Sequence, residues 1–377
     1  MDFELGDAQR MVRDTARDFA RRVLAPQAAR FEAEGEIPRS VFEQLAGLGL
    51  MGVNVPDELG GAEAGAVAYS LAMTEIAAGC ASTAVTMAVT NMVGEVIARF
   101  GSEAQKRRYN PALCRGALGA FALSEVEAGS DPGGMKTVAR REGEGWVIDG
   151  TKQWISHGGE SGVLVVWART GGEGAKGLSC FLVEPSMEGF SVAGHEDKMG
   201  LRASHTASLV FEGLHVPADA LLGEEGGGFR IAMMALDGGR IGIASQALGI
   251  AEAAWDASVR YAKERHQFGV PIAQHQAIQW MIADGRKELD AARTLVLRAA
   301  WLKEQGIPFT REASMAKVYA TEAAWRVCNR AVQVHGGYGY TREFPVERHL
   351  RDVRVTQIYE GTSEVQRIVI SRSLLRE

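Results

Sequence analysis

The sequence predicts a multi-domain α+β protein with an N-terminal α-helical domain, a middle β-barrel domain and a C-terminal four-helix bundle. The chain has 377 residues, a length that suits two or three domains, and 46% of them are hydrophobic, enough for a sizeable core. The spacing of its apolar residues changes twice along the chain, from a helical period to short apolar runs and back to a helical period. We therefore expect domains at residues 1–120, 121–229 and 230–377.

The first zone has the spacing of amphipathic helices, with apolar residues recurring at Met11, Val12, Phe19 and Val23. Prolines divide this zone, whereas residues 66–100 contain almost no helix breaker except glycine. We expect two buried helices in that stretch.

The middle zone has the shorter period of strands. Residues 138–141 and 146–148 flank a Glu-Gly-Glu-Gly turn, which predicts a hairpin. Three further apolar runs, at 162–167, 178–183 and 207–211, are bounded largely by glycines and other turn residues. Strands at this spacing favour a small barrel or a sandwich.

The last zone returns to helical spacing. Residues 231–265, 274–304 and 311–334 form three long helical patterns, and 347–376 form a fourth that is interrupted near Gly361. Consecutive long helices favour a bundle.

Composition excludes several classes of function. The formal net charge is −6, which argues against general nucleic-acid binding. The four cysteines form no C-x-x-C pair, so we expect no structural zinc, no disulfide framework and a reducing compartment. The eight histidines include no H-x-x-x-H pair, and no metal site is expected. We interpret the scattered histidines as solvated or hydrogen-bonded.

Targeting signals are not evident in the sequence. No run of about 18 apolar residues is visible, so no membrane span is expected. Residues 1–5 are acidic and lack the basic-then-apolar order of a signal peptide. These observations predict a cytoplasmic location.

One glycine pattern is misleading. Residues 172–177 fit G-x-G-x-x-G, the fingerprint of a dinucleotide-binding turn, but that turn must open a helix. Residues 178–183 follow it with a strand pattern, so we interpret the glycines as a hairpin loop.

Three glycine-rich corners next to helices, at 121–131, 333–340 and 359–364, are better candidates for a ligand site. The third combines an apolar approach with Glu360, Gly361 and two hydroxyls. An acid at a helix interruption inside a bundle is partly desolvated, which makes it a stronger base. The alternative is that Glu360 only caps a helix.

At these corners the chain resembles the acyl-CoA dehydrogenases. Residues 122–125 (Ala-Leu-Ser-Glu) with 128–131 (Ala-Gly-Ser-Asp) match one signature, and 333–340 match a second. Residues 359–367 match the catalytic stretch. Further blocks agree in order across essentially the whole chain, at 154–156, 236–240 and 264–269.

The resemblance implies a homotetramer, a dimer of dimers, in which each FAD lies between the β domain and the bundle. One set of residues would bind the cofactor within the chain: Phe121, Leu123, Ser124, Gly129, Ser130, Trp154, Ser156, Thr362 and Glu364. A neighbouring subunit would supply a second set of cofactor-binding residues: Arg265, Gln276, Gln333, Gly336 and Gly337. Phe268 is a further cofactor-binding residue that the resemblance implies.

The implied reaction is the α,β-dehydrogenation of a saturated acyl-CoA to the trans-2-enoyl-CoA, as in fatty-acid β-oxidation. Glu360 would remove the α-proton, and the β-hydrogen would pass as hydride to the flavin. By this resemblance, the residues that contact the substrate are Ser130, Asp237, Arg240 and Gly361. Electrons would then pass to an electron-transfer flavoprotein.

Details of the blocks indicate the subgroup. Some relatives place the base where this chain has Gly239, and residues 239–250 are most similar to short-chain members. We expect a butyryl-type substrate, or a small branched acyl-CoA. Val126 stands where proline is common and His157 where asparagine is usual, and His157 is a candidate for altering flavin potential or redox-partner docking.

Two alternatives stay open. The same fold serves acyl-CoA oxidases and flavin monooxygenases, which use oxygen. A relative of the fold associates with DNA, but that function needs a basic surface, and residues 330–377 hold eight Arg against six Asp and Glu.

Overall fold

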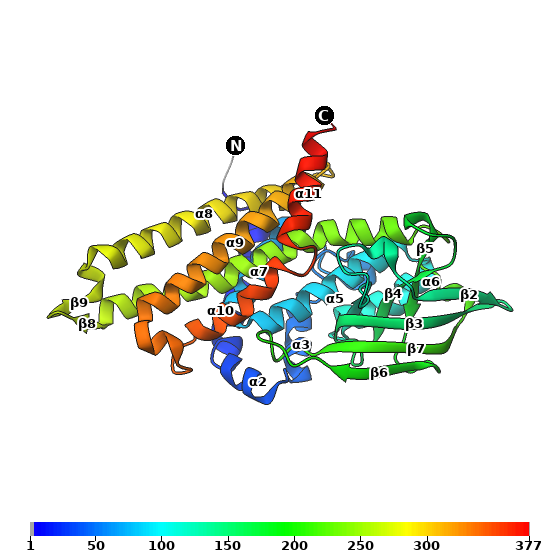
Figure 1. Cartoon of the computed structure of the whole chain (residues 1–377), viewed down its shortest axis with the longest axis horizontal. Coiled ribbons are helices and arrows are strands. Elements are labelled where there is room, and N and C mark those ends of the chain that lie inside the picture. The colour runs from blue at the N-terminus through cyan, green and yellow to red at the C-terminus, as the bar shows by residue number, and fades with distance from the viewer. Residues whose placement is uncertain (1–3, 377) are drawn as a thin grey trace.

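The computed structural model describes residues 4–376, which form two helical regions and one curled sheet that lies at one end of the molecule (Figure 1). The N-terminal region contains six α-helices: α1 (Asp7–Phe19), α2 (Ala28–Glu34), α3 (Arg39–Gly47), α4 (Ala66–Gly79), α5 (Ala81–Phe100) and α6 (Glu103–Cys114). The two buried helices expected in 66–100 are confirmed as α4 and α5. α6 begins at a capping box, in which Ser102 Oγ accepts from the Gln105 amide and Gln105 Oε1 accepts from the Ser102 amide.

α5 is the one described helix that is long and apolar enough to cross a membrane by length and composition. Its most apolar window is 83% buried within the protein, where it packs on α4, α6 and α7. Burial of this kind is typical of a core helix.

The middle region is a seven-stranded mixed sheet. Its strands are β1 (Gly119–Ala122), β2 (Val138–Glu142), β3 (Gly145–Ser156), β4 (Val163–Arg169), β5 (Leu178–Val183), β6 (Phe190–His195) and β7 (Thr206–Val216). The order is β1-β4-β2-β3-β7-β6, with β5 also paired to β4. The expected hairpin is confirmed as β2–β3, and the glycine-rich loop 172–177 leads into β5 rather than into a helix.

The expected β-barrel is only partly supported. Within the described residues no ladder joins β5 to β6, so the sheet curls without closing. The free edge of β5 is occupied instead by the segment that leads into the bundle. There Leu221 bridges to Phe181, and the Leu222 amide donates to the Cys180 carbonyl at 2.8 Å.

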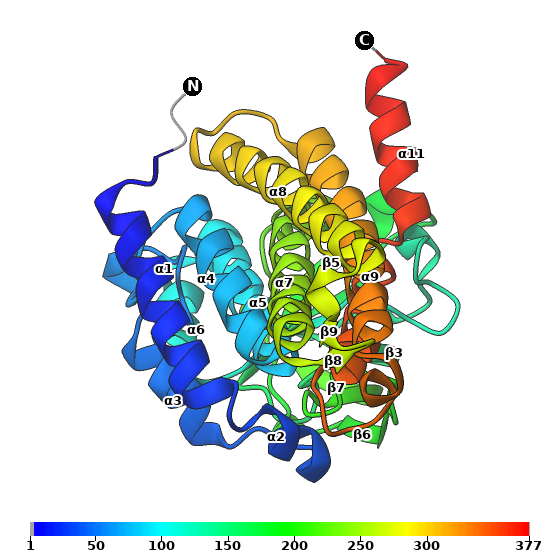
Figure 2. The same cartoon turned by 90° about the vertical axis from the view of Figure 1, so that its left-hand side faces the viewer.

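The C-terminal region is built on three long helices, α7 (Gly228–Glu264), α8 (Gln276–Glu304) and α9 (Thr310–His335). They match the three long helical patterns in the sequence. The fourth pattern is split into α10 (Val346–Arg354) and α11 (Ser363–Leu374), as the glycine at 361 predicted. α11 projects from the body of the protein (Figure 2).

Close packing of α7 against α9 depends on small side chains. α9 carries a buried stripe of alanines at 313, 316, 320, 324 and 331, each at most 2% exposed.

The short β-hairpin β8 (His266–Gln267) and β9 (Val270–Pro271) joins α7 to α8 at the end of the bundle far from the sheet (Figure 1).

Candidate active site

A cavity of about 1070 Å³ lies where the sheet, α5, α7 and the turn before α11 meet. Its walls are mainly apolar. α5 contributes Val85, Ala88, Val89 and Met92 to one wall, and none of these had been singled out from the sequence. In the sequence these four residues look like any others in an apolar helix, so nothing marks them as lining a cavity.

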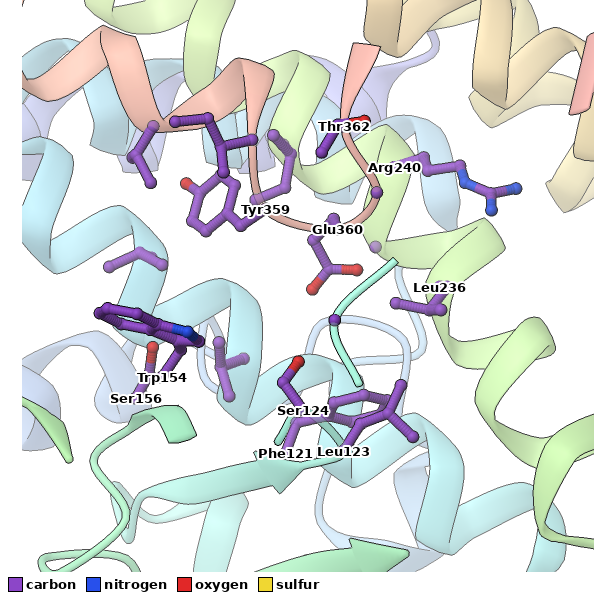
Figure 3. A pocket seen from close by; sticks show the side chains of 18 of the residues that line it. Phe121, Leu123, Ser124, Trp154, Ser156, Leu236, Arg240, Tyr359, Glu360 and Thr362 are labelled. Atoms are coloured by element: carbon purple, nitrogen blue, oxygen red, sulfur yellow. The ribbon is translucent and has the colours of Figure 1, made fainter. Parts of the chain in front are cut away.

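Glu360 extends into this cavity from the turn between α10 and α11 (Figure 3). The turn exists because two successive residues adopt left-handed backbone, Glu360 with φ of 54° and Gly361 with φ of 88°. Left-handed backbone costs a non-glycine residue about 1–2 kcal/mol. Thr362 then caps α11, because its hydroxyl accepts from the Val365 amide at 3.3 Å. This turn places the Glu360 carboxylate in the cavity (Figure 3).

Glu360 is half-buried, and its buried Oε2 atom is unpaired. No hydrogen-bond partner for Glu360 Oε2 occurs among the described residues. Burial raises the pKa of Glu360 to about 7, although the positive charges of Arg240 and Lys317 act in the opposite direction. A desolvated carboxylate with a free oxygen at neutral pH is suited to accept a proton from a carbon acid.

Gly239 provides the space for this carboxylate. A Cβ at Gly239 would lie 2.4 Å from Glu360 Oε2 and 2.9 Å from Glu360 Cδ. The absence of a side chain at 239 and the presence of the acid at 360 are therefore two parts of one arrangement.

The wall opposite Glu360 comes from the sheet (Figure 3). Phe121 lies in β1, Leu123 and Ser124 follow it directly, and Trp154 and Ser156 lie at the end of β3. Trp154 has a φ of 65° and leaves 58% of its surface exposed, which frees an aromatic ring to contact a flat ligand. This wall combines aromatic faces with hydroxyl groups.

A buried ion pair fixes the loop that carries this wall. Lys152 Nζ, fully buried, donates to Glu125 Oε1 at 2.7 Å and to the Leu123 carbonyl at 3.2 Å. The Gln153 amide donates to the Ser124 carbonyl at 2.9 Å. Lys152 was missed in the sequence, where nothing distinguishes it from a solvent-exposed lysine in a strand.

Eleven of the sequence-predicted site residues line the cavity: Phe121, Leu123, Ser124, Gly129, Ser130, Trp154, Ser156, Arg240, Glu360, Gly361 and Thr362. Asp237 does not line it but holds Arg240, whose Nη1 donates to Asp237 Oδ1 at 2.5 Å. Figure 3 shows the Arg240 side chain extending away from the Glu360 carboxylate. Glu364 is exposed in the first turn of α11.

The other predicted residues do not reach this cavity. Arg265 directly follows α7, Phe268 lies in the β8–β9 turn, and Gln276 begins α8. Gln333, Gly336 and Gly337 lie at the end of α9. The segment after α7 and the segment after α9 lie close together, since the Arg265 guanidinium is 5.5 Å from the centre of the Tyr338 ring.

His157 is buried. Its Nε2 is 2.8 Å from Thr86 Oγ1 and 3.3 Å from Ser204 Oγ, so the hydrogen-bonded interpretation of this histidine is confirmed. Val126, the other departure from the family pattern, is 77% exposed on the loop after β1. Within residues 4–376 no cluster of His, Cys, Asp or Glu could hold a metal ion.

Comparisons with known proteins agree with this geometry. Family models for the N-terminal, middle and C-terminal domains of acyl-CoA dehydrogenase match residues 6–117, 120–214 and 226–375. The mitochondrial short-chain specific acyl-CoA dehydrogenase of Bos taurus is 49% identical, over 99% of this chain and 91% of that protein. The chain belongs to the acyl-CoA dehydrogenase family. It is therefore a flavin-dependent oxidoreductase.

Solved structures give the same result. Butyryl-CoA dehydrogenase from Megasphaera elsdenii is similar with a TM-score of 0.97 and 43% identity, over the full length of both chains. A chain in the structure of the electron transferring flavoprotein of Acidaminococcus fermentans is similar with a TM-score of 0.98, 43% identity and full coverage of both chains. The acyl-CoA dehydrogenase fold is thus shown over the whole chain.

Proposed function

We propose that this protein is an FAD-dependent dehydrogenase of short-chain acyl-CoA, with the trans-2-enoyl-CoA as product and an electron-transfer flavoprotein as electron acceptor. The observation that carries the proposal is the desolvated Glu360 carboxylate, which faces an aromatic, hydroxyl-bearing wall across one cavity. The alternative that Glu360 only caps a helix is not favoured, because Thr362 is the residue that caps α11.

The residues present fit a flavin. Trp154 and Phe121 offer apolar faces to a planar ring system, and Ser124 and Ser156 place hydroxyls beside them. When bound, the flavin would accept the hydride that leaves the substrate β-carbon.

The chain's own contribution is proton abstraction and exclusion of water. Glu360 takes the α-proton onto its carboxylate, using an oxygen that no described group occupies. The apolar wall of α5 excludes water from the acyl chain, which preserves the basicity of the carboxylate. For this transfer to occur, the thioester must bind with its α-carbon next to the Glu360 carboxylate.

Assembly would complete the cofactor site. Gly336 and Gly337 have no atom within 4 Å of a Cβ position, so their backbone is open to a ligand or a second chain. Large apolar side chains are exposed on the neighbouring segments, with Phe268 93%, Trp280 60% and Tyr340 89% exposed. These features support a homotetramer in which this end of the bundle covers a neighbour's FAD.

We expect Arg265→Ala to weaken FAD retention, because the guanidinium is suited to bind a pyrophosphate from the neighbouring chain. The measurement is flavin content by absorbance after gel filtration, together with the oligomeric state at high and low protein concentration. Wild-type protein should also lose colour on dissociation. A monomer that keeps full FAD occupancy would contradict this arrangement.

The substrate prediction is a preference for butyryl-CoA or a small branched acyl-CoA over long chains. It rests on the short-chain character of residues 236–250 and on Gly239. The test is anaerobic flavin bleaching with straight and branched acyl-CoAs, each compared by kcat/KM. A higher kcat/KM for dodecanoyl-CoA than for butyryl-CoA would contradict the preference.

The same assay distinguishes the electron acceptor. Enzyme that has been reduced by substrate should be reoxidised rapidly by an electron-transfer flavoprotein and slowly by air. Rapid reoxidation by air alone would instead indicate an oxidase or a monooxygenase.

The four cysteines are free and buried, which supports a reducing compartment such as the cytoplasm.

A further inference from the structure

Lys317 is a buried lysine that the reaction described so far does not use. It lies on α9 within the alanine stripe and its side chain is fully buried. Its Nζ donates to the Gly361 carbonyl at 2.7 Å, and no ion pair joins it to a carboxylate of residues 4–376. A desolvated ammonium is costly, so its retention here points to a role.

The charged groups around Lys317 come from four elements. Glu360 approaches from the catalytic turn, Arg240 from α7, Glu364 from α11 and Glu322 from α9 itself. Burial lowers the pKa of Lys317 to about 7, while the charge of Glu360 favours its protonated form. Conversely, the positive charge of Lys317 favours the ionised form of Glu360.

The hydrogen bond acts on the residue next to the base. Gln366 Nε2 also donates to the Gly361 carbonyl, at 2.9 Å, so this one carbonyl is held by two side chains from two helices. Gln366 Nε2 also donates to the Glu360 carbonyl at 3.2 Å, so the peptide groups on both sides of Gly361 are held, and with them the backbone that directs the Glu360 side chain.

We propose that Lys317 is a positioning residue for proton abstraction: its Nζ holds the Gly361 carbonyl so that Glu360 points into the cavity, and its charge, when present, favours the ionised form of Glu360. The proposal rests on the function proposed above. It assigns two separable effects to one side chain, a geometric effect through the hydrogen bond and an electrostatic effect through the charge.

Two substitutions separate these effects. Lys317→Met removes both the donor and the charge, whereas Lys317→Gln keeps a donor without the charge. Lys287→Met is the control for loss of a lysine, because the Lys287 side chain is 72% exposed and pairs with Asp284 on α8. All variants are studied as FAD-loaded assemblies whose flavin content and thermal stability are measured first.

The first measurement is the rate of anaerobic flavin reduction by butyryl-CoA as a function of pH. The wild-type rate should fall as the pH drops through about 7, since Glu360 must be ionised. Loss of a neighbouring positive charge raises a carboxylate pKa, so both Lys317 variants should move this limb to higher pH, by about one unit. The limiting rate at high pH should fall about tenfold or more in Lys317→Met and recover in part in Lys317→Gln.

A second measurement does not depend on flavin reduction. Mass spectrometry follows deuterium exchange at the α-carbon of an acyl-CoA analogue that cannot lose a β-hydrogen, and its pH profile should shift in the same way. If the wild type shows no exchange or bleaching, the proposed function fails. If the wild type reacts and the Lys317 variants keep its pH profile, the assignment of Lys317 is wrong. If Lys317→Met does not fold, the profile of Lys317→Gln decides.

Discussion

Glu360→Gln is expected to lower the rate of anaerobic flavin reduction by about 10²- to 10⁴-fold, the usual contribution of a general base. Glutamine keeps the size of the side chain but cannot accept the α-proton. The variant should fold and retain FAD, because the substitution removes a buried charge that has no hydrogen-bond partner on Oε2. Rapid-mixing absorbance at the flavin band, with butyryl-CoA in the absence of oxygen, measures the effect.

The control for this variant is Glu103→Gln, a change of the same kind on the exposed face of α6. It should leave the reduction rate close to that of the wild type. If Glu360→Gln bleaches its flavin at a rate near that of the wild type, another residue is the base. Binding of acyl-CoA, followed by perturbation of the flavin spectrum, should persist in Glu360→Gln and show that the loss lies in the chemical step.

The second large effect is expected from Gly239→Ala. The added Cβ would lie 2.4 Å from Glu360 Oε2, so the carboxylate must move, and it is free to do so at the end of its side chain. A displacement near 1 Å at a reacting atom costs about 100-fold in rate. The protein should nevertheless be at least as stable as the wild type, because alanine is favoured over glycine within a helix by about 1 kcal/mol.

Gly238→Ala is the matched control, one residue earlier on the same helix. Its Cβ would meet only the end of the Lys303 side chain, at 3.2 Å from Nζ, and that flexible group can give way. Both alanine variants should be at least as stable to heat as the wild type, but only Gly239→Ala should lose activity. Equal rates of flavin reduction in the two variants would show that the space at 239 is not needed by the base.

Much of the fold follows from local periodicity. The spacing of apolar residues predicts α7, α8 and α9, and the long apolar stretch without helix breakers at 66–100 predicts α4 and α5. Short apolar runs between turn residues predict β4, β5 and β7, and the Glu-Gly-Glu-Gly turn predicts the hairpin of β2 and β3. Strands β1 and β6 were not predicted, since β1 has only four residues and β6 is exposed along most of its length.

The closure of the sheet could not be predicted in this way. Whether β5 pairs with β6 depends on what else reaches the free edge of β5, and here the 221–222 segment takes that edge on its way to α7. This is a long-range contact with no signature in the strand itself.

The sequence by itself determined the family, the three-part organisation and the base candidate, because these depend on residue types in a fixed order along the chain. Only the tertiary structure decided that Glu360 shares its space with Gly239, and that two buried lysines, Lys152 and Lys317, hold the two loops that face each other across the cavity. The physical reason is that burial and charge coupling arise between segments far apart in the chain. A lysine in a helical or strand pattern looks solvent-exposed until packing removes the water around it.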